Sequence, residues 1–140
     1  MSMCTFDPDY SSAARYVCAP PLRAKEEQDR LWKALRRGEI QTISTDHCSF
    51  TLAQKDMGRE DFTKIPGGLP GVETRGELIY SYGVAKRRIS AARMCRCLSE
   101  NPARLYGLFP RKGILRPGSD ADIVVYDPTL SHVIRAEDCV

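Results

Sequence analysis

Hydrophobic positions recur at helical spacing in the first third of the chain. Between residues 25 and 37, Leu31, Trp32 and Leu35 are spaced for one helical face among mostly polar neighbours. Acidic residues stand near the start of this segment and basic residues near its end, which complements the dipole of a helix. Gly38 follows as a C-terminal stop. The pattern therefore predicts an amphipathic helix over residues 25–37.

Three further helices are predicted in the second half of the chain. Residues 73–82 carry apolar side chains on one face, and Gly83 ends the segment. Ser90 is a suitable N-cap for the next helix, because its hydroxyl can accept a backbone hydrogen bond. Asn101 and Pro102 then open a short fourth helix, which a glycine closes.

Short runs of apolar and β-branched residues predict strands. They are residues 16–19, which two prolines end, residues 40–45 and residues 121–126. Residues 49–72 contain lysine, aspartate, glycine and proline with little periodicity, so we expect a long loop there. A loop of this length in a compact domain is usually functional.

The order of these elements predicts an α/β chain with a separate β unit at its end. A strand, helix, strand, loop and helix in succession form a parallel unit. We divide the chain into an irregular segment (1–15), an α/β segment of barrel type (16–110) and a β segment (111–140). A complete (β/α)₈ barrel needs about 250 residues, whereas this chain has 140.

Composition argues against two kinds of partner. The net charge of +3 comes from 21 basic and 18 acidic residues, and the basic residues are scattered rather than gathered in the stripe of a nucleic-acid-binding module. No window approaches the roughly 20 apolar residues of a membrane span, and no signal-peptide pattern begins the sequence. We expect no nucleic-acid or membrane partner and a cytoplasmic location. The six cysteines are then expected to be reduced, with most of them acting as small core hydrophobes.

Asp46 is the strongest candidate for chemistry. It ends the predicted strand 40–45 and precedes the long loop, where barrel enzymes place catalytic groups. Its carboxylate can ligate a metal ion or accept a proton; the alternative is that it caps the next turn. His47 points to the opposite face of a strand, and His132 is interpreted as structural. A hydrolytic zinc site needs at least three protein ligands, more than these residues supply.

Several runs of residues match motifs of one enzyme family. Residues 44–50 read Ser-Thr-Asp-His-Cys-Ser-Phe, residues 16–23 read Tyr-Val-Cys-Ala-Pro-Pro-Leu-Arg, and residues 60–73 contain Phe-Thr-Lys-Ile-Pro. Residues 101–107 read Asn-Pro-Ala-Arg-Leu-Tyr-Gly, and residues 113–128 contain Gly-Ser-Asp-Ala-Asp. With these motifs the chain resembles the dihydropyrimidinases and D-hydantoinases, which are cyclic amidohydrolases.

The resemblance implies a fold, a reaction and a metal centre. The fold is the C-terminal portion of a (β/α)₈ TIM barrel with the start of the return into a β-sandwich domain. The reaction is metal-dependent hydrolysis of the cyclic amide bond of dihydropyrimidines or 5-substituted hydantoins. In the family a binuclear centre, usually Zn²⁺, is held by four histidines, a carboxylated lysine and one aspartate. Asp46 matches that aspartate, which also shuttles a proton to the leaving nitrogen, and the other ligands lie in earlier strands.

The resemblance also assigns two substrate-binding positions, although their residue types differ from the family's. Ala19 stands where the family has a serine, and Gly67 where it has an asparagine. The family makes these contacts largely through backbone groups, so Ala19 and Gly67 are predicted to contact the ring. The choice between a dihydrouracil and a hydantoin ring stays open.

Two functions of different classes follow from the resemblance. The chain is a segment of a ring-opening amidohydrolase, active when the rest of the barrel is supplied and then expected to form a homo-oligomer. Alternatively, it is a non-catalytic truncated remnant or an assembly partner of a full-length relative, because open strand edges would promote association. The isolated chain is expected to show no turnover, since one ligand cannot hold a binuclear centre.

Overall fold

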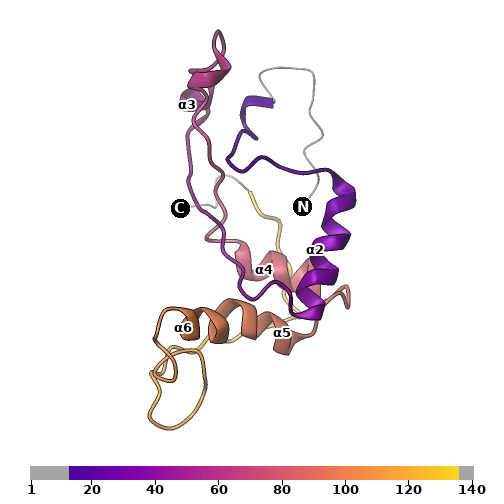
Figure 1. Cartoon of the computed structure of the whole chain (residues 1–140), viewed down its shortest axis with the longest axis vertical. Helices are drawn as coiled ribbons and strands as arrows, with labels where there is room; N and C mark the ends of the chain where they lie inside the picture. The colour runs from indigo at the N-terminus through magenta and orange to yellow at the C-terminus, as the bar shows by residue number, and fades with distance from the viewer. Residues whose placement is uncertain (1–12, 136–140) are drawn as a thin grey trace.

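The computed structural model describes residues 13–135, and helices make up its regular structure. In chain order the elements are α2 (Lys25–Arg37), α3 (Leu52–Asp56), the 3₁₀ turn η1 (Phe62–Lys64), α4 (Arg75–Ile79), the π-helical η2 (Tyr80–Val84), α5 (Ala91–Cys95), the π-helical η3 (Arg96–Glu100) and α6 (Asn101–Leu105). Figure 1 shows α4 and α5 near the C-terminal end of α2 and α6 farther from it, whereas the chain between α2 and α4 runs out to α3 and returns.

Helix α2 forms over the predicted residues. Gly38 adopts a left-handed conformation with φ +84°, and its N–H donates to the carbonyl of Leu35 at 3.2 Å. Leu35 is buried and Trp32 packs against the core, while Leu31 is exposed. The predicted apolar face is therefore confirmed at two of its three positions.

A small apolar core joins the helices. Leu35 from α2, Cys97 from η3 and Ile89 from the turn before α5 are its buried members. The partly buried side chains packed against them are Trp32, Ile40, Ile43, Ile79, Val84 and Met94. The core thus holds α2 against the later helices and against the start of the segment that leads to α3.

The helix predicted to begin at Ser90 is confirmed, and α6 begins at Asn101 with Pro102 in its first turn as predicted, although it continues from η3 without a break. The Ser90 hydroxyl accepts the Arg93 N–H at 3.1 Å, and residues 91–105 are helical without a break. A proline lacks the N–H that an α-helix interior needs, and a π-helical stretch is one arrangement that accommodates it. Here η3 directly precedes Asn101 and Pro102, so the helix continues through them. Gly107, with φ +70°, follows α6 as expected.

The helix predicted over residues 73–82 starts at Arg75 and does not end at Gly83. The π-helical η2 passes through Gly83, which is buried. A Cβ at this position would lie 2.8 Å from the ring of Trp32. The glycine therefore serves the close approach of two helical segments, and the prediction that it stops the helix is wrong.

The predicted strands do not form in the part of the chain that the structure describes. Residues 16–19, 40–45 and 121–126 have no ladder, and the one bridge, a parallel pair, joins His47 to Leu69. A strand needs a neighbour to pair with, and the Ile43 N–H instead donates to a helical carbonyl, that of Cys97, at 3.2 Å. The predicted loop 49–72, in turn, contains α3 and η1.

Two other expectations are tested in part. Of the four cysteines within residues 13–135 only Cys97 is buried, so the prediction of mostly core cysteines is wrong there; Cys4 and Cys139 lie outside the described residues. The predicted irregular start falls largely on residues 1–12, which are also outside them. No helix in the described range has the length and apolar character to cross a membrane.

Candidate active site

Three segments that are distant in sequence meet near α3. The Gly68 N–H donates to the carbonyl of Val17 at 3.1 Å, and the Cys48 N–H donates to the carbonyl of Leu69 at 3.1 Å. A Cβ at Gly71 would lie 3.3 Å from the Cβ of Thr45, so the contact continues along both segments. The structure thereby brings together the three motifs that carry the predicted site residues.

Asp46 lies at the end of the extended segment that leaves the helical core. Its side chain is exposed, and its backbone has φ +48°, in the left-handed region that aspartate tolerates better than most residues. Thr51 caps α3, so the alternative that Asp46 caps the next turn finds no support in this structure. Within residues 13–135 the Asp46 carboxylate has no hydrogen bond or ion pair and is available to a ligand.

His47 has a structural role that fits its predicted separation from Asp46. Its Nδ1 accepts hydrogen bonds from the N–H groups of Gly71 at 3.1 Å and Val72 at 3.3 Å. A ring nitrogen that accepts a hydrogen bond does so through its lone pair, so Nδ1 is the acceptor atom of this ring. The ring therefore fastens the 45–48 segment to the 68–72 segment. The other histidine, His132, lies 3.4 Å from a carboxylate oxygen of Glu77.

Ala19 and Gly67 lie side by side. A Cβ built on Gly67 would lie 3.8 Å from the Ala19 backbone nitrogen and 4.0 Å from the Cα of Cys18. Both residues are exposed, and the Ala19–Pro20 peptide bond is cis. The two positions predicted to contact one ring are thus neighbours at the surface.

Lys55 is the residue at this site that the sequence did not reveal. Its side chain is only 4% exposed, and its Nζ donates to the carbonyls of Val17 at 2.8 Å, Pro66 at 2.7 Å and Gly68 at 3.0 Å. The ring of Phe50 lies 5.3 Å from the same nitrogen. We call Lys55 together with the backbone of residues 17–19 and 66–69 the lysine junction.

Burial lowers the pKa of Lys55, because the low-polarity surroundings disfavour the charged ammonium. Thiolates at Cys18 and Cys48, where they form, raise the pKa again through attraction between opposite charges. An ammonium has three donors, and each of them has a carbonyl acceptor here. The buried charge is therefore stabilised by backbone dipoles and not by a carboxylate.

Local sequence explains how Lys55 is positioned but not why it is buried. Thr51 and Gln54 form a capping box: the Gln54 N–H donates to the Thr51 hydroxyl at 3.2 Å, and the Thr51 N–H donates to the Gln54 side chain at 2.8 Å. This motif predicts the start of α3 and is readable in the sequence. Burial of the following lysine depends on carbonyls far away along the chain, for which the sequence gives no signal.

The residues present do not make a metal centre by themselves. Within residues 13–135 no group of three or more histidine, cysteine, aspartate or glutamate side chains could hold a metal ion. Cys95 and Cys97, which are two residues apart, are both free thiols. Asp46 is a suitable oxygen ligand, but a binuclear zinc centre needs more donors than these residues offer.

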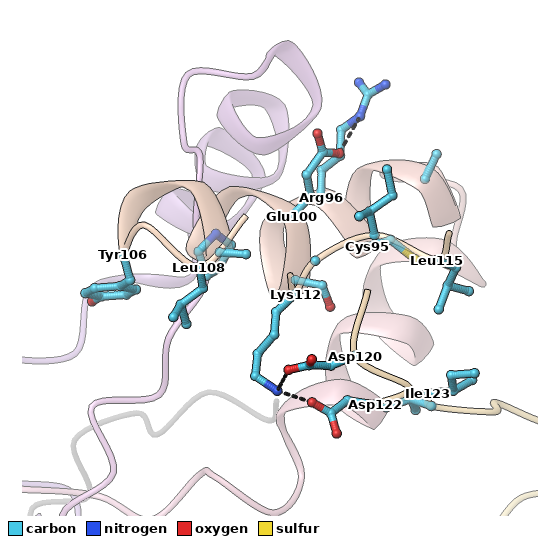
Figure 2. Close-up of a pocket in the computed structure, with 17 residues that line it drawn as sticks. Cys95, Arg96, Glu100, Tyr106, Leu108, Lys112, Leu115, Asp120, Asp122 and Ile123 are labelled. Atoms are coloured by element: carbon cyan, nitrogen blue, oxygen red, sulfur yellow. Dashed lines mark hydrogen bonds and ion pairs between the residues drawn. The ribbon is translucent and has the colours of Figure 1, made fainter. Parts of the chain in front are cut away.

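A cavity of about 670 Å³ lies away from the lysine junction, between the 91–105 helix and the segment 112–124. Figure 2 shows Lys112 reaching Asp120 and Asp122 at its edge, with the Lys112–Asp120 pair at 3.0 Å. Hydrogen bonds to these carboxylates raise the pKa of Lys112, and the bond from Lys112 lowers the pKa of Asp122. Asp46, Ala19 and Gly67 are not among the residues that line this cavity.

The sequence matches the amidohydrolase family over residues 3–138. The chain belongs to this family. Among curated proteins it is 48% identical over 132 residues to a D-hydantoinase of Streptomyces coelicolor, which covers 94% of this chain and 28% of the relative. It is 49% identical over 125 residues to a D-hydantoinase of Geobacillus stearothermophilus, covering 89% of this chain and 26% of the relative.

Solved structures of similar proteins superpose closely on this chain. A D-hydantoinase from Bacillus sp. AR9 superposes with a TM-score of 0.90 at 47% identity, covering 94% of this chain and 29% of that chain. A dihydropyrimidinase from Brevibacillus agri gives 0.87 at 48% identity, covering 91% and 28%. The predicted resemblance is confirmed, and the chain spans between a quarter and a third of the length of these relatives.

Proposed function

We propose that this chain is the C-terminal part of a metal-dependent cyclic amidohydrolase that opens dihydropyrimidine or 5-substituted hydantoin rings. In this proposal residues 16–110 are the last elements of a (β/α)₈ barrel and residues 111–140 begin the return into a β-sandwich. The observation that carries the proposal is the meeting of three motif-bearing segments around the lysine junction. It is supported by relatives named D-hydantoinase and dihydropyrimidinase at close to half identity.

Each site residue has a role in the proposal that fits its surroundings. Asp46 is the one metal ligand that this chain contributes, and its exposed carboxylate also carries a proton to the leaving nitrogen of the ring. Ala19 and Gly67 offer neighbouring backbone groups, which orient the ring by hydrogen bonds. Bound Zn²⁺ would activate water and polarise the amide carbonyl. The remaining metal ligands come from outside this chain, and the completed enzyme is a homo-oligomer.

A hybrid enzyme tests the proposal. Residues 3–138 replace the matching segment of the Streptomyces coelicolor D-hydantoinase, and ring opening of hydantoin and dihydrouracil is measured in parallel. We expect turnover of at least one ring, and the ratio of kcat/KM for the two rings identifies the preferred substrate. Hydrolysis of neither ring by a folded hybrid would contradict the proposed function.

The role of Asp46 has its own variant in the same hybrid. Asp46→Ala is expected to lower kcat by about 10²-fold or more, because a positioned proton carrier alone contributes about 10²–10⁴-fold. Asp56→Ala removes an exposed carboxylate at the end of α3 and is expected to leave kcat unchanged. Equal activity of the two variants would mean that Asp46 is not at the reacting centre.

A non-catalytic role is the second candidate, and one observation favours it. The side chains of Ile123, Val124 and Val125 are 60%, 89% and 90% exposed, which leaves a β-branched run open to association. As an assembly partner, the chain would use this run to bind a full-length relative. Size-exclusion chromatography of the chain mixed with that relative separates the two functions, because a stable mixed complex together with an inactive hybrid supports the second.

A further inference from the structure

Lys55 bonds the backbone close to Ala19 and Gly67, the two positions that are proposed to hold the ring. Its ammonium binds the carbonyls of Pro66 and Gly68, which flank Gly67 on either side, and the carbonyl of Val17, two residues before Ala19. One side chain thereby fixes the backbone next to each proposed contact. Because those contacts are made by backbone groups, a displacement of the backbone is a displacement of the binding groups themselves.

The geometry of the bonds suits the ammonium of a lysine better than the guanidinium of an arginine. The three carbonyls come from two chain segments and converge on one nitrogen at 2.7–3.0 Å. An ammonium is a compact point charge with three donors, whereas a guanidinium is a planar fork. A side chain of similar length without donors would leave the carbonyls of Pro66 and Gly68 without this bond, while the Val17 carbonyl would keep the Gly68 N–H. A buried carbonyl without a partner is costly.

The junction is also packed too tightly to rearrange freely. A Cβ at Gly68 would lie 2.5 Å from the carbonyl oxygen of Cys48 and 2.8 Å from its Cβ. The segment that carries Gly67 is therefore pressed against the segment that carries Asp46. Lys55 bonds the 17–19 segment and the 66–69 segment at the same time.

We propose that Lys55 is a positioning residue, which sets the backbone of Ala19 and Gly67 for recognition of the cyclic ureide. This inference rests on the proposed function and adds to it a residue that contacts neither metal nor substrate. Lys55 acts through the backbone groups on either side of the ring, so its loss weakens ring binding more than it slows the chemical step.

The experiment uses the hybrid enzyme with Lys55→Met, a change of similar length that removes all three donors. We expect KM for the preferred ring to rise about tenfold or more with kcat changed less than threefold, because contacts made equally in the ground and transition states appear in KM. Loss of folded protein alone would lower the apparent kcat and leave KM unchanged. A wild-type KM in a Lys55→Met hybrid would overturn the inference.

Two further variants keep the result decisive. Lys64→Met makes the same change at an exposed lysine of the same segment, and its KM is expected to equal that of the unmodified hybrid. Lys55→Arg keeps the charge but not the converging geometry, and is expected to give a KM between those of the wild type and Lys55→Met. Where Lys55→Met fails to fold, a wild-type KM for Lys55→Arg overturns the inference instead.

The outcomes for the two proposals remain distinct. If the hybrid with Lys55 intact opens neither ring, the proposed function fails and the role of Lys55 in recognition fails with it. If that hybrid is active and its KM does not depend on Lys55, only the inference about Lys55 is overturned.

Discussion

The helical core and the lysine junction are stabilised in opposite ways. In the core, Leu35, Ile89 and Cys97 exclude water, so its stability comes from apolar packing that many side chains share. In the lysine junction, a single buried ammonium holds three carbonyls of the surrounding backbone. Apolar contacts are redundant and tolerate small changes, whereas a polar centre depends on one group. We therefore expect the two regions to unfold separately and to be sensitive to different substitutions.

Removal of the Lys55 ammonium should have the largest effect of any single change. Each buried carbonyl left without its bond costs about 1–3 kcal/mol, and relief from burying a charge offsets part of this. We expect Lys55→Met to destabilise the lysine junction by about 3 kcal/mol, which speeds exchange of the Gly68 amide hydrogen roughly 100-fold. Nuclear magnetic resonance measures this rate.

The amides of α2 serve as the internal reference for that measurement. They are expected to keep their exchange rates in the Lys55→Met variant, because α2 makes no contact with the Lys55 ammonium. If the amides of α2 and of Gly68 speed up by the same factor, the two regions unfold as one unit and the comparison is wrong.

Adjacent glycines provide the next test. Gly68→Ala would place a Cβ 2.5 Å from a backbone oxygen, whereas the contacts of a Cβ at Gly67 begin at 3.8 Å. We expect Gly68→Ala to cost about 2 kcal/mol, in the range for overpacking, and Gly67→Ala to change stability by less than about 0.5 kcal/mol. The Cys48 N–H donates to the Leu69 carbonyl, so its protection from hydrogen exchange measures the local stability in both variants. Equal protection of the Cys48 amide in the two variants would show that the backbone near Gly68 shifts easily to make room for a Cβ.

The helical core should respond more mildly to the same substitution. A Cβ at Gly83 would meet the ring of Trp32 at 2.8 Å, and that ring is a side chain that can shift. We expect Gly83→Ala to destabilise by about 1–2 kcal/mol, and Gly76→Ala, with nothing within 4 Å, to stabilise α4 by about 0.5–1 kcal/mol. Urea unfolding followed by the fluorescence of Trp32, the single tryptophan, measures both. A stabilising Gly83→Ala would mean that the core is loosely packed.

The smallest expected effect is a dependence on pH. Burial lowers the pKa of Lys55 in the folded chain below its value in the unfolded chain, so the unfolded state binds more protons between the two values. Stability relative to Lys55→Met should therefore rise as pH increases through this alkaline window, by at most about 1.4 kcal/mol per pH unit. Unfolding curves of both proteins at several alkaline pH values check the sign. A difference that falls with pH would contradict it.

Local signals in the sequence predicted the helices better than any other element. The glycine stop after α2 and the Ser90 cap act within one turn, so their residues suffice to place them. The strands 40–45 and 121–126 were predicted from β-branched residues, but a ladder depends on a partner elsewhere, and none forms within the described residues. Composition indicates an extended conformation and cannot supply a neighbouring strand.

For the candidate site, the motifs identified the residues, and the structure shows which of them lie close together. Resemblance placed Asp46, Ala19 and Gly67 in one site, and the structure shows Ala19 beside Gly67. The left-handed backbone of Asp46 and the burial of Lys55 could not be predicted, because both depend on how distant segments pack. The roles of Asp46 in metal binding and of Ala19 and Gly67 in ring binding stay predictions.

The π-helical turn η3 is wider than an α-helical turn, and its bonds join residues five apart instead of four. This wider turn leaves the Cys97 carbonyl free for the Ile43 N–H, and the Asn101 side chain donates to the Gln41 carbonyl at 2.7 Å. Across η3 the Asn101 N–H donates to the carbonyl of Arg96, five residues earlier. An α-helical turn without the extra width would pair that N–H with the Cys97 carbonyl, because α-helical bonds join residues four apart. The Ile43 N–H would then lose its acceptor, so one wide turn of a helix keeps open a bond that fastens the segment leading to Asp46.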